Sequence, residues 1–292
     1  MKKLFCFGLG YTARALIADL HKQGGWQFAG TCRSAEKCQD MRLLNIEAHV
    51  FDGQTPLEPL WDRLAECTHL LVSIPPAPER GDPVLACHEQ DLARLNHLHW
   101  VGYLSTTAVY GDRQGEWVYD DTPEAPTSAR GRLRYAAEQS WRRLYQDHGL
   151  PLHIFRLGSI YGPGRGQLHS LLTGRLQKII KPGQVFSRIH VDDIVQTLQA
   201  SFARPHPGRS YNVVDDVPSS SPEVIDYICD LMDRPRLEGV DFDSAPLSPL
   251  MKSFYGENKK VDNTRLHKEL GVTLKYPSYR EGYKALVDQV RA

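Results

Sequence analysis

The sequence lacks the features that mark several classes of protein. Its six cysteines form no C-x-x-C pair, which gives no support for zinc ribbons or thioredoxin-like redox motifs. Lys plus Arg number 35 and Asp plus Glu also number 35, so the basic excess of a generic nucleic-acid binder is missing. No apolar run is long enough to span a bilayer, and Gly8 and Gly10 interrupt the short one near the start. We therefore expect a cytoplasmic protein that binds neither nucleic acid nor membrane.

Short apolar runs alternate with helical patterns through the first half of the 292 residues. The spacing of Ala13, Leu16, Ile17 and Leu20 places one face of a helix against a core. Strands are predicted at 4–7, 27–31, 48–51, 69–74, 100–105 and 153–157, with a further helix through 135–145. This alternation predicts an α/β fold with a Rossmann-type, doubly wound parallel sheet.

The rhythm changes after Gly162, where irregular pieces and short strands interleave. We expect a smaller C-terminal substrate lobe, with 244–255 as a loop and 188–214 returning to the main sheet. The predicted division is a dinucleotide-binding domain of 1–166 with 185–214, and a substrate lobe of 167–184 with 215–292.

A glycine-rich turn follows the first predicted strand and opens the first helix. It reads Gly8, Leu9, Gly10, Tyr11, Thr12 and Ala13. Gly8 permits a tight turn, Gly10 allows the backbone to approach a pyrophosphate, and Ala13 permits close packing of helix on strand. The free amides of Tyr11 and Thr12 at the helix N-terminus then favour phosphate. The turn predicts a site for a nicotinamide dinucleotide.

The end of the second strand indicates which dinucleotide is preferred. An NAD-binding fold usually places an acid here, but this chain has Arg33 and Ser34. These two residues predict a grip on the 2′-phosphate of NADP, with NAD still possible. The alternative is an arginine that is merely solvated.

Other residues after predicted strands are further candidates for the cofactor site. Asp52 follows the third strand and either meets the adenine edge or caps a turn. Ile74 and Pro75 end the fourth strand, at the sheet edge where ligands bind in such folds.

Several segments together resemble the extended branch of the short-chain dehydrogenase/reductase superfamily, most closely its atypical, NAD(P)-dependent epimerase/dehydratase-like members. The matching segments, in order, are the glycine turn, 104–111, 156–164, 188–193, 211–213 and 260–271. The resemblance implies a Rossmann domain with a small substrate lobe, often acting on nucleotide sugars. It also implies dimerisation, here through 83–97 and 130–148.

The chain departs from this family where the family keeps its Tyr-x-x-x-Lys pair. Arg130 stands at the position of the tyrosine, and Arg134 stands at that of the lysine. An arginine is effectively always protonated and is a poor general acid. We expect the two guanidinium groups to bind an anion on the substrate or the cofactor. The alternative is surface ion pairing with acids such as Glu138.

The resemblance assigns roles to further residues. Thr106 matches the catalytic Ser or Thr of the family, whereas the acid pair of dehydratases is absent. Ser159 matches a position near the substrate diphosphate and is counted with the cofactor site. Tyr110 or Tyr161 is a candidate to donate the missing proton, although burial under the lobe is the favoured interpretation.

Charged residues in the second half have structural alternatives. Arg165, Arg175 and Arg188 extend the expected cation set for an anionic substrate. Asp192 or Asp193 is expected to cap a helix that starts near Ile194. The histidines are too sparse for a metal site.

Two functions follow from these observations. One is an NAD(P)-dependent oxidoreductase or epimerase-like enzyme with a sugar-like or anionic substrate. The other is a non-catalytic NADP-binding sensor or partner-binding protein, because the usual proton shuttle is missing.

Overall fold

The computed structural model describes residues 1–291, and their contacts divide them into two compact units. Unit 1 comprises Met1–Ser105, Arg132–Arg156 and Leu198–Tyr211. Unit 2 comprises Thr106–Gly131, Leu157–Thr197 and the described residues from Asn212 onward. Each unit is described by itself.

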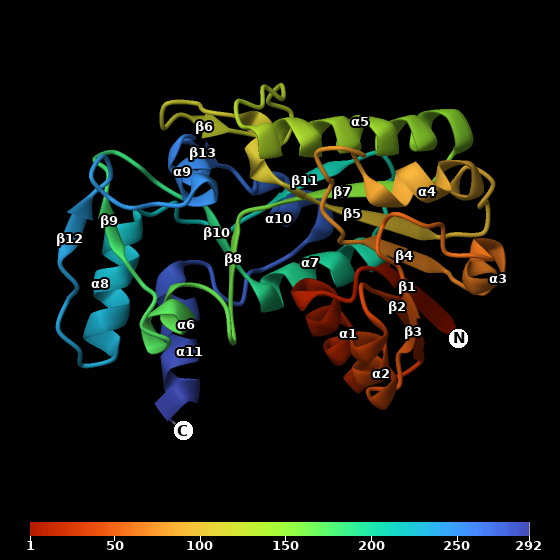
Figure 1. Cartoon of the computed structure of the whole chain (residues 1–292), viewed down its shortest axis with the longest axis horizontal. Helices are drawn as coiled ribbons and strands as arrows, with labels where there is room; N and C mark the ends of the chain where they lie inside the picture. The colour runs from red at the N-terminus through yellow and green to blue at the C-terminus, as the bar shows by residue number, and fades with distance from the viewer. Residues whose placement is uncertain (292) are drawn as a thin grey trace. The chain divides into compact units, whose positions relative to one another are not determined.

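A seven-stranded parallel sheet, in the order β11-β7-β5-β4-β1-β2-β3, forms the centre of the fold (Figure 1). Its strands are β1 (Lys2–Phe7), β2 (Trp26–Cys32), β3 (Glu47–Val50), β4 (His69–Val72), β5 (Trp100–Thr106), β7 (Leu152–Leu157) and β11 (Ser210–Val213). Leu4 pairs with Phe28 on one side and with His69 on the other. The order reverses at β1, so the carboxyl ends of β1 and its neighbours flank a crevice. The predicted fold class is confirmed.

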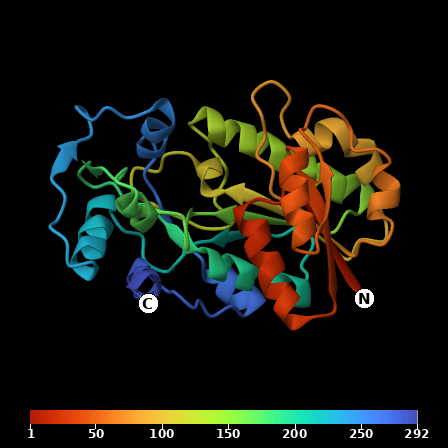
Figure 2. The same ribbon diagram turned by 60° about the horizontal axis from the view of Figure 1, so that its bottom comes forward.

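Helices of unit 1 cover both faces of this sheet, as Figures 1 and 2 show. They are α1 (Tyr11–Gln23), α2 (Ala35–Leu43), α3 (Leu60–Leu64), α4 (Pro83–Leu92) and the unit 1 part of α5 (Ala129–His148). The core on the α4 and α5 face contains Phe7, Val72, Leu85 and Trp141, all buried. The apolar runs thus form strands that are buried on both faces, as parallel strands require.

Unit 2 is built from shorter elements. Its helices are η1 (Thr107–Tyr110), α6 (Gln167–Leu172), α8 (Ser221–Leu231), α9 (Pro249–Tyr255), α10 (Thr264–Leu270) and α11 (Tyr279–Arg291). Its strands form parallel pairs: β8 (Ser159–Tyr161) with β10 (Arg188–His190), β9 (Lys178–Ile180) with β12 (Gly239–Asp241), and β6 (Trp117–Val118) with β13 (Lys260–Val261). Tyr161, Ile225, Tyr283 and Leu286 pack in its core.

Two predictions of local structure are wrong and one is right in part. The predicted loop 244–255 contains helix α9, which Ser248 caps by accepting a hydrogen bond from the Met251 amide. Of the segment 188–214, residues 210–213 return to the main sheet as β11, as expected, whereas 188–190 pair with β8. Helix α7 (Val191–Ala203) begins before Asp193, so neither Asp192 nor Asp193 is its cap. The Asp193 carboxylate instead accepts hydrogen bonds from the amides of Lys275 and Tyr276.

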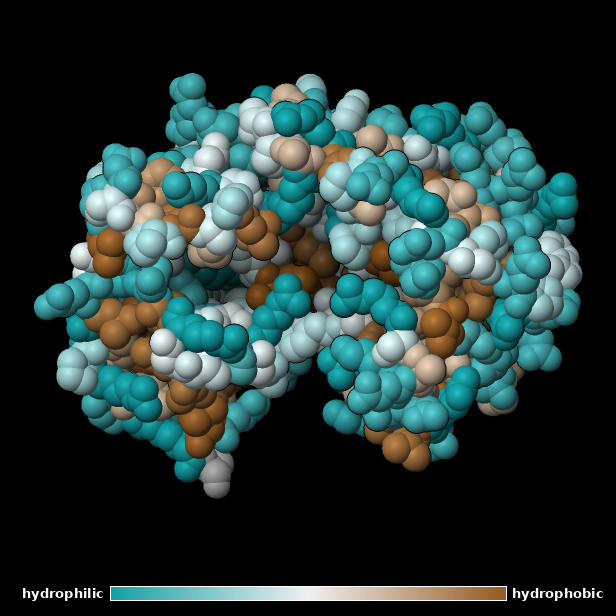
Figure 3. Space-filling view, viewed as in Figure 1, coloured by the Kyte–Doolittle hydropathy of each residue, from teal (hydrophilic) through white to brown (hydrophobic). Residues whose placement is uncertain are grey.

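The surface is mixed in polarity. On the face that Figure 3 shows, hydrophilic residues cover most of the area and apolar residues appear between them in small groups. Among residues 1–291, no helix combines the length and the apolar character needed to cross a membrane.

Candidate functional site

The glycine turn after β1 has the geometry that a dinucleotide loop requires. Gly8 has a φ of +94°, and a Cβ there would lie 2.8 Å from Ser73 Oγ. The Gly8 amide donates to Thr31 Oγ1 at 2.9 Å, and Ser73 Oγ donates to the Gly8 carbonyl at 2.6 Å. Thr31 of β2 and Ser73, directly after β4, therefore hold the turn from two sides, and no sequence pattern indicated the role of Thr31.

Helix α1 begins directly after this turn. No side chain caps it at Gly10, and a Cβ on Gly10 would meet no atom within 4 Å. Thr12 and Ala13 are buried, as close packing of the helix on the sheet requires. Tyr11 is the first helical residue and is half-buried. The loop thus leaves open space in front of a helix N-terminus, which favours phosphate.

A cavity of about 670 Å³ lies within unit 1, at the carboxyl ends of β1 to β4. The predicted residues that line it are Gly8, Gly10, Arg33, Asp52, Ile74 and Pro75. Sequence reasoning missed Lys37, Gln54 and Arg80, which line it as well. The structure thus brings half of the predicted cofactor residues to one cavity.

The two cations after β2 lie on the wall of this cavity. Arg33 directly follows β2, and Lys37 lies in the first turn of helix α2. Neither makes an ion pair with any residue that the structure describes. Ser34 caps α2, since its hydroxyl accepts a hydrogen bond from the Lys37 amide. The spacing of Arg33 and Lys37 was the available signal for the second cation.

The side chain of Asp52 caps a turn. Its Oδ1 accepts hydrogen bonds from the amides of Gln54 and Thr55, at 2.8 and 3.3 Å. These amides hold the pKa of Asp52 below its ordinary value. Of the two interpretations of Asp52, the structure shows the turn cap.

The predicted catalytic residues of unit 2 are already engaged. Thr106 Oγ1 accepts a hydrogen bond from the Ala108 amide and caps η1. Tyr110 is completely buried, and its hydroxyl donates to Asn212 Oδ1 at 2.7 Å. Tyr161 is also buried, and burial raises the pKa of its phenol. None of these contacts favours proton donation by Tyr110 or Tyr161.

Arg130 and Arg134 belong to different units and have different neighbours. The Arg130 guanidinium lies 4.2 Å from the centre of the Phe254 ring. Arg134 Nη1 donates to the Leu104 carbonyl at 2.8 Å and to the Tyr103 hydroxyl at 3.1 Å. Glu138, the acid proposed as an alternative partner, is instead buried against other residues of unit 1. A role of either arginine in anion binding stays a prediction.

A second cavity, of about 500 Å³, lies within unit 2. Polar residues from several elements face it: Ser159, Gln167, Arg175, Arg188 and Ser221. Aromatic residues form much of the remaining wall: Tyr161, Phe186, Phe254, Tyr255 and Tyr283. Ser159, predicted as a cofactor contact, is on this cavity.

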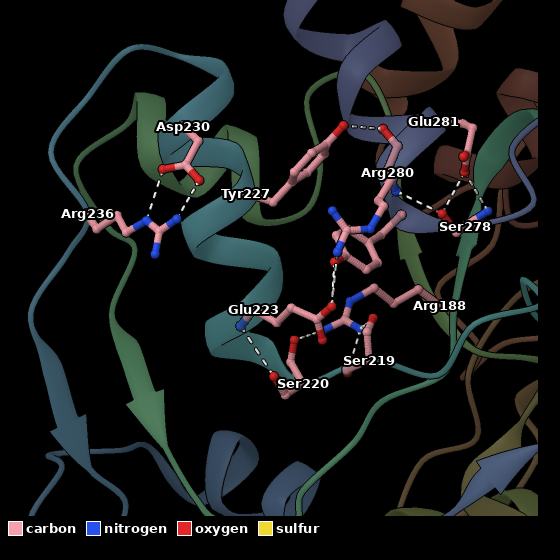
Figure 4. A network of polar contacts seen from close by, with 11 residues as sticks. Arg188, Ser219, Ser220, Glu223, Tyr227, Asp230, Arg236, Ser278, Arg280 and Glu281 are labelled. Carbon is pink, nitrogen blue, oxygen red and sulfur yellow. Dashed lines mark hydrogen bonds and ion pairs between the residues drawn. The ribbon is translucent and has the colours of Figure 1, made fainter.

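Arg188 is the buried charged residue on the wall of this second cavity. Its side chain is buried, and Nη1 donates to Ser219 Oγ at 2.7 Å and to the carbonyls of Ser219 and Phe186 at 2.8 and 3.1 Å (Figure 4). No carboxylate among residues 1–291 lies within ion-pair distance of it. Burial lowers the pKa of the guanidinium, although an arginine stays charged at neutral pH. Arg188 is therefore a buried cation held only by neutral oxygens.

A buried carboxyl group lies near Arg188 without pairing with it. Neither carboxyl oxygen of Asp215 has a hydrogen-bond partner among the described residues. Burial raises the pKa of Asp215 well above its ordinary value, while the Arg188 charge opposes that rise. Burial thus opposes the charged form of Asp215, and the nearby Arg188 charge favours it.

Comparison with known proteins relates the chain to a family. Residues 90–214 match the model of the NAD dependent epimerase/dehydratase family. The chain thus resembles this family over the matched segment, which is less than half of its 292 residues. The match covers strands β5, β7 and β11 and the turn that carries Thr106. The family resemblance predicted from the ordered motifs is confirmed.

Relatives and structural neighbours differ in how much is known of them. The chain is 49% identical to a functionally unknown conserved protein from Silicibacter pomeroyi DSS, with a TM-score of 0.90 and complete coverage of both chains. It is 25% identical to protein YeeZ of Escherichia coli (strain K12) over 95% of this chain and 97% of YeeZ. UDP-glucuronic acid 4-epimerase from Bacillus cereus, solved with UDP-glucuronic acid and NAD, shares the fold with a TM-score of 0.80 at 18% identity, covering 100% of this chain and 99% of that one.

Proposed function

We propose that this protein is an NAD(P)-dependent oxidoreductase or epimerase-like enzyme that acts on an anionic, sugar-like small molecule. The observation that carries the proposal is Arg188, a buried guanidinium on a cavity wall with no carboxylate partner among the described residues. Burying a charge costs free energy unless a partner compensates it. A fold that retains such a cation beside open space favours a ligand that brings the negative charge.

The surroundings of Arg188 suit a phosphorylated ligand. Its Nη1 is fully engaged by Ser219 and Phe186, so the planar guanidinium is held in one orientation before any ligand binds. A preorganised guanidinium matches phosphate or carboxylate geometry. Arg175 adds a second, exposed cation to the same cavity. Aromatic walls beside these charges favour a ligand that carries a ring next to its anionic group.

The unit 1 cavity fits a dinucleotide. The open space beside Gly10, the uncapped start of α1 and the positive-φ turn at Gly8 would together provide a backbone cradle for a pyrophosphate. Ile74 and Pro75 would contact the bound dinucleotide along the edge of the sheet. Arg33 and Lys37 would hold a 2′-phosphate, which supports a preference for NADP.

The chemistry would be divided between cofactor and chain. A bound nicotinamide supplies hydride transfer, and the residues of the chain orient the reactants and hold protons. Arg188 would position the anionic end of the substrate. Thr106, the last residue of β5 and the cap of η1, would keep the family position of the catalytic Ser or Thr. Arg130 and Arg134 cannot replace the tyrosine as proton donors, because their guanidinium groups stay protonated.

The sensor alternative rests on the replacement of the Tyr-x-x-x-Lys pair by Arg130 and Arg134. A protein that has lost its proton shuttle can bind NADP and a sugar nucleotide without turning them over. The two functions differ in one observable. An enzyme changes the redox state of NADP or the stereochemistry of a sugar, whereas a sensor changes neither.

The test is a panel of UDP- and dTDP-sugars incubated with the protein and either NADP⁺ or NADPH. Absorbance at the nicotinamide band reports net redox change, and proton NMR of the sugar reports epimerisation that has no net redox change. Turnover that Arg188→Met abolishes supports the enzyme. Tight binding of NADPH with no product from any sugar supports the sensor.

A further inference from the structure

Helix α9 forms one wall of the unit 2 cavity. Met251, Phe254 and Tyr255 of the helix face the cavity, as do 246–248 just before it. Leu250, which does not line the cavity, is 58% exposed, and Met251 is 41% exposed. A helix this short has little intrinsic stability, so its contacts decide whether it stays in place.

The segment that carries α9 is anchored at its two ends. Before the helix, the Phe242 amide donates to the Ile180 carbonyl. At its C-terminus the buried Tyr255 ring packs against Phe186 and Phe242, with ring centres 5.2 and 5.4 Å apart. Lys181 Nζ also donates to the Tyr255 carbonyl. Between these anchors, the segment 246–254 crosses the cavity.

Phe254 is the residue of α9 that contacts the first turn of α5, in the part of that helix that belongs to unit 2. The Arg130 guanidinium lies over its ring at 4.2 Å, and both side chains are half-buried. A guanidinium over an aromatic face is attracted to the ring, more strongly where water is partly excluded. The same ring lines the cavity. Arg130 therefore contacts a residue of the cavity wall.

We infer that Arg130 is a positioning residue, which acts through Phe254 to hold α9 over the unit 2 cavity. This role explains an arginine rather than a lysine at this position, because a planar guanidinium stacks on a ring and a compact ammonium does not. It also needs no proton transfer. Arg130 would thereby set how readily a ligand enters and leaves. The consequence for ligand exchange rests on the proposed function; the contact with α9 does not.

Hydrogen exchange of α9 amides tests the contact without any ligand. In the full-length protein, Arg130→Met keeps the length of the side chain and removes its charge. We expect the amides of α9, including Lys252, to exchange about three- to tenfold faster in this variant. Phe254→Trp, which keeps an aromatic face, should retain wild-type exchange, whereas Phe254→Leu should match Arg130→Met. Arg143→Met, on the exposed side of α5, is the matched control and should change nothing.

A double-mutant cycle makes the result specific to the pair. In the Phe254→Leu background, Arg130→Met should cause no further increase in α9 exchange. Unchanged exchange in Arg130→Met, or an increase spread equally over α8 and α11, would overturn the inference, since the latter indicates general loosening.

A second experiment measures ligand dissociation from the unit 2 cavity, with UDP as the probe. We expect Arg130→Met to speed UDP dissociation by about the same three- to tenfold factor in stopped-flow measurements. Equal dissociation rates in the two proteins would overturn the claim that α9 controls ligand exchange. Failure of the wild-type protein to bind UDP would count against the proposed function alone, because the exchange result stands independently of it.

Discussion

The Arg156 guanidinium donates two hydrogen bonds to the Glu138 carboxylate, at 2.8 and 3.2 Å, and both side chains are fully buried in unit 1. Ser105 Oγ donates to the same carboxylate. The network joins α5 to β7 and to the end of β5. Removing one member of such a buried pair leaves an uncompensated charge.

We expect Glu138→Gln to lower the free energy of unfolding by about 3–5 kcal/mol, measured by urea denaturation. The exposed pair of Lys284 and Asp288, 2.7 Å apart, provides the control. Asp288→Asn should cost less than about 0.5 kcal/mol, because exposed ion pairs contribute little. A similar loss of unfolding free energy in the two variants would show that the buried Arg156 charge does not depend on Glu138 for compensation.

Substitutions of Gly10 should remove dinucleotide binding in proportion to side-chain size. The space beside Gly10 is open, so Gly10→Ala and Gly10→Val should both fold, as judged by circular dichroism. We expect Gly10→Ala to weaken NADPH binding and Gly10→Val to abolish it in calorimetric titration, since the branched side chain fills the place of the phosphates. Normal NADPH affinity in Gly10→Val would remove the glycine turn from the cofactor site.

Arg33 and Lys37 should determine the choice between cofactors. We expect Arg33→Ala to weaken NADPH binding by about tenfold to a hundredfold and to leave NADH binding unchanged. Lys37→Ala should act in the same direction with a smaller effect, because a lysine binds phosphate without a bidentate fork. Lys22→Ala, on the last turn of α1, is the control. Equal affinity of the wild-type protein for NADPH and NADH is the result that this account cannot accommodate.

The stability of unit 1 should fall on acidification through His153. Burial lowers the pKa of His153 to about 4, and its Nε2 accepts a hydrogen bond from the His206 amide. The unfolded state, with an ordinary pKa near 6.5, binds the proton first as the pH falls. The contribution of neutral His153 is therefore fully present above about pH 6.5 and is lost progressively down to about pH 4.

The measurement is urea denaturation at pH 7 and pH 4.5. His153→Gln keeps a donor and an acceptor but cannot titrate in this range. We expect it to lose about 2 kcal/mol less stability than wild type between the two pH values. Identical losses would mean that the pKa of His153 does not differ between the folded and the unfolded protein.

The unit 1 cavity was predictable because local patterns specify it. The turn at Gly8 and Gly10, the strand alternation and the missing acid near Arg33 all lie within a few residues of the elements they describe. Lys37 was within reach of the same reasoning, one helical turn after Arg33. Asp52 was not, because a carboxylate that caps a turn and one that meets a ligand look the same in sequence.

The unit 2 cavity was less predictable because it depends on contacts between distant segments. Arg188 was a candidate, but only its packing against Ser219 shows that it is buried without a carboxylate among the described residues. Arg130 and Arg134 lie one helical turn apart in α5, as their spacing indicates. The contact of Arg130 with Phe254 could not be predicted, because Phe254 lies 124 residues further along the chain. The prediction of a loop at 244–255 was wrong for a different reason: a helix as short as α9 gives a weak periodic signal in the sequence.

The most direct test of the account is a calorimetric titration of UDP into wild type, Arg188→Met and Arg236→Met, with NADPH affinity measured in parallel. Arg236 is the matched control, because it forms an exposed ion pair with Asp230 in the same unit (Figure 4). The account predicts that Arg188→Met weakens UDP binding about tenfold to a hundredfold and that NADPH affinity and the Arg236→Met variant stay at wild-type values. Equal UDP affinity in Arg188→Met and wild type would contradict it.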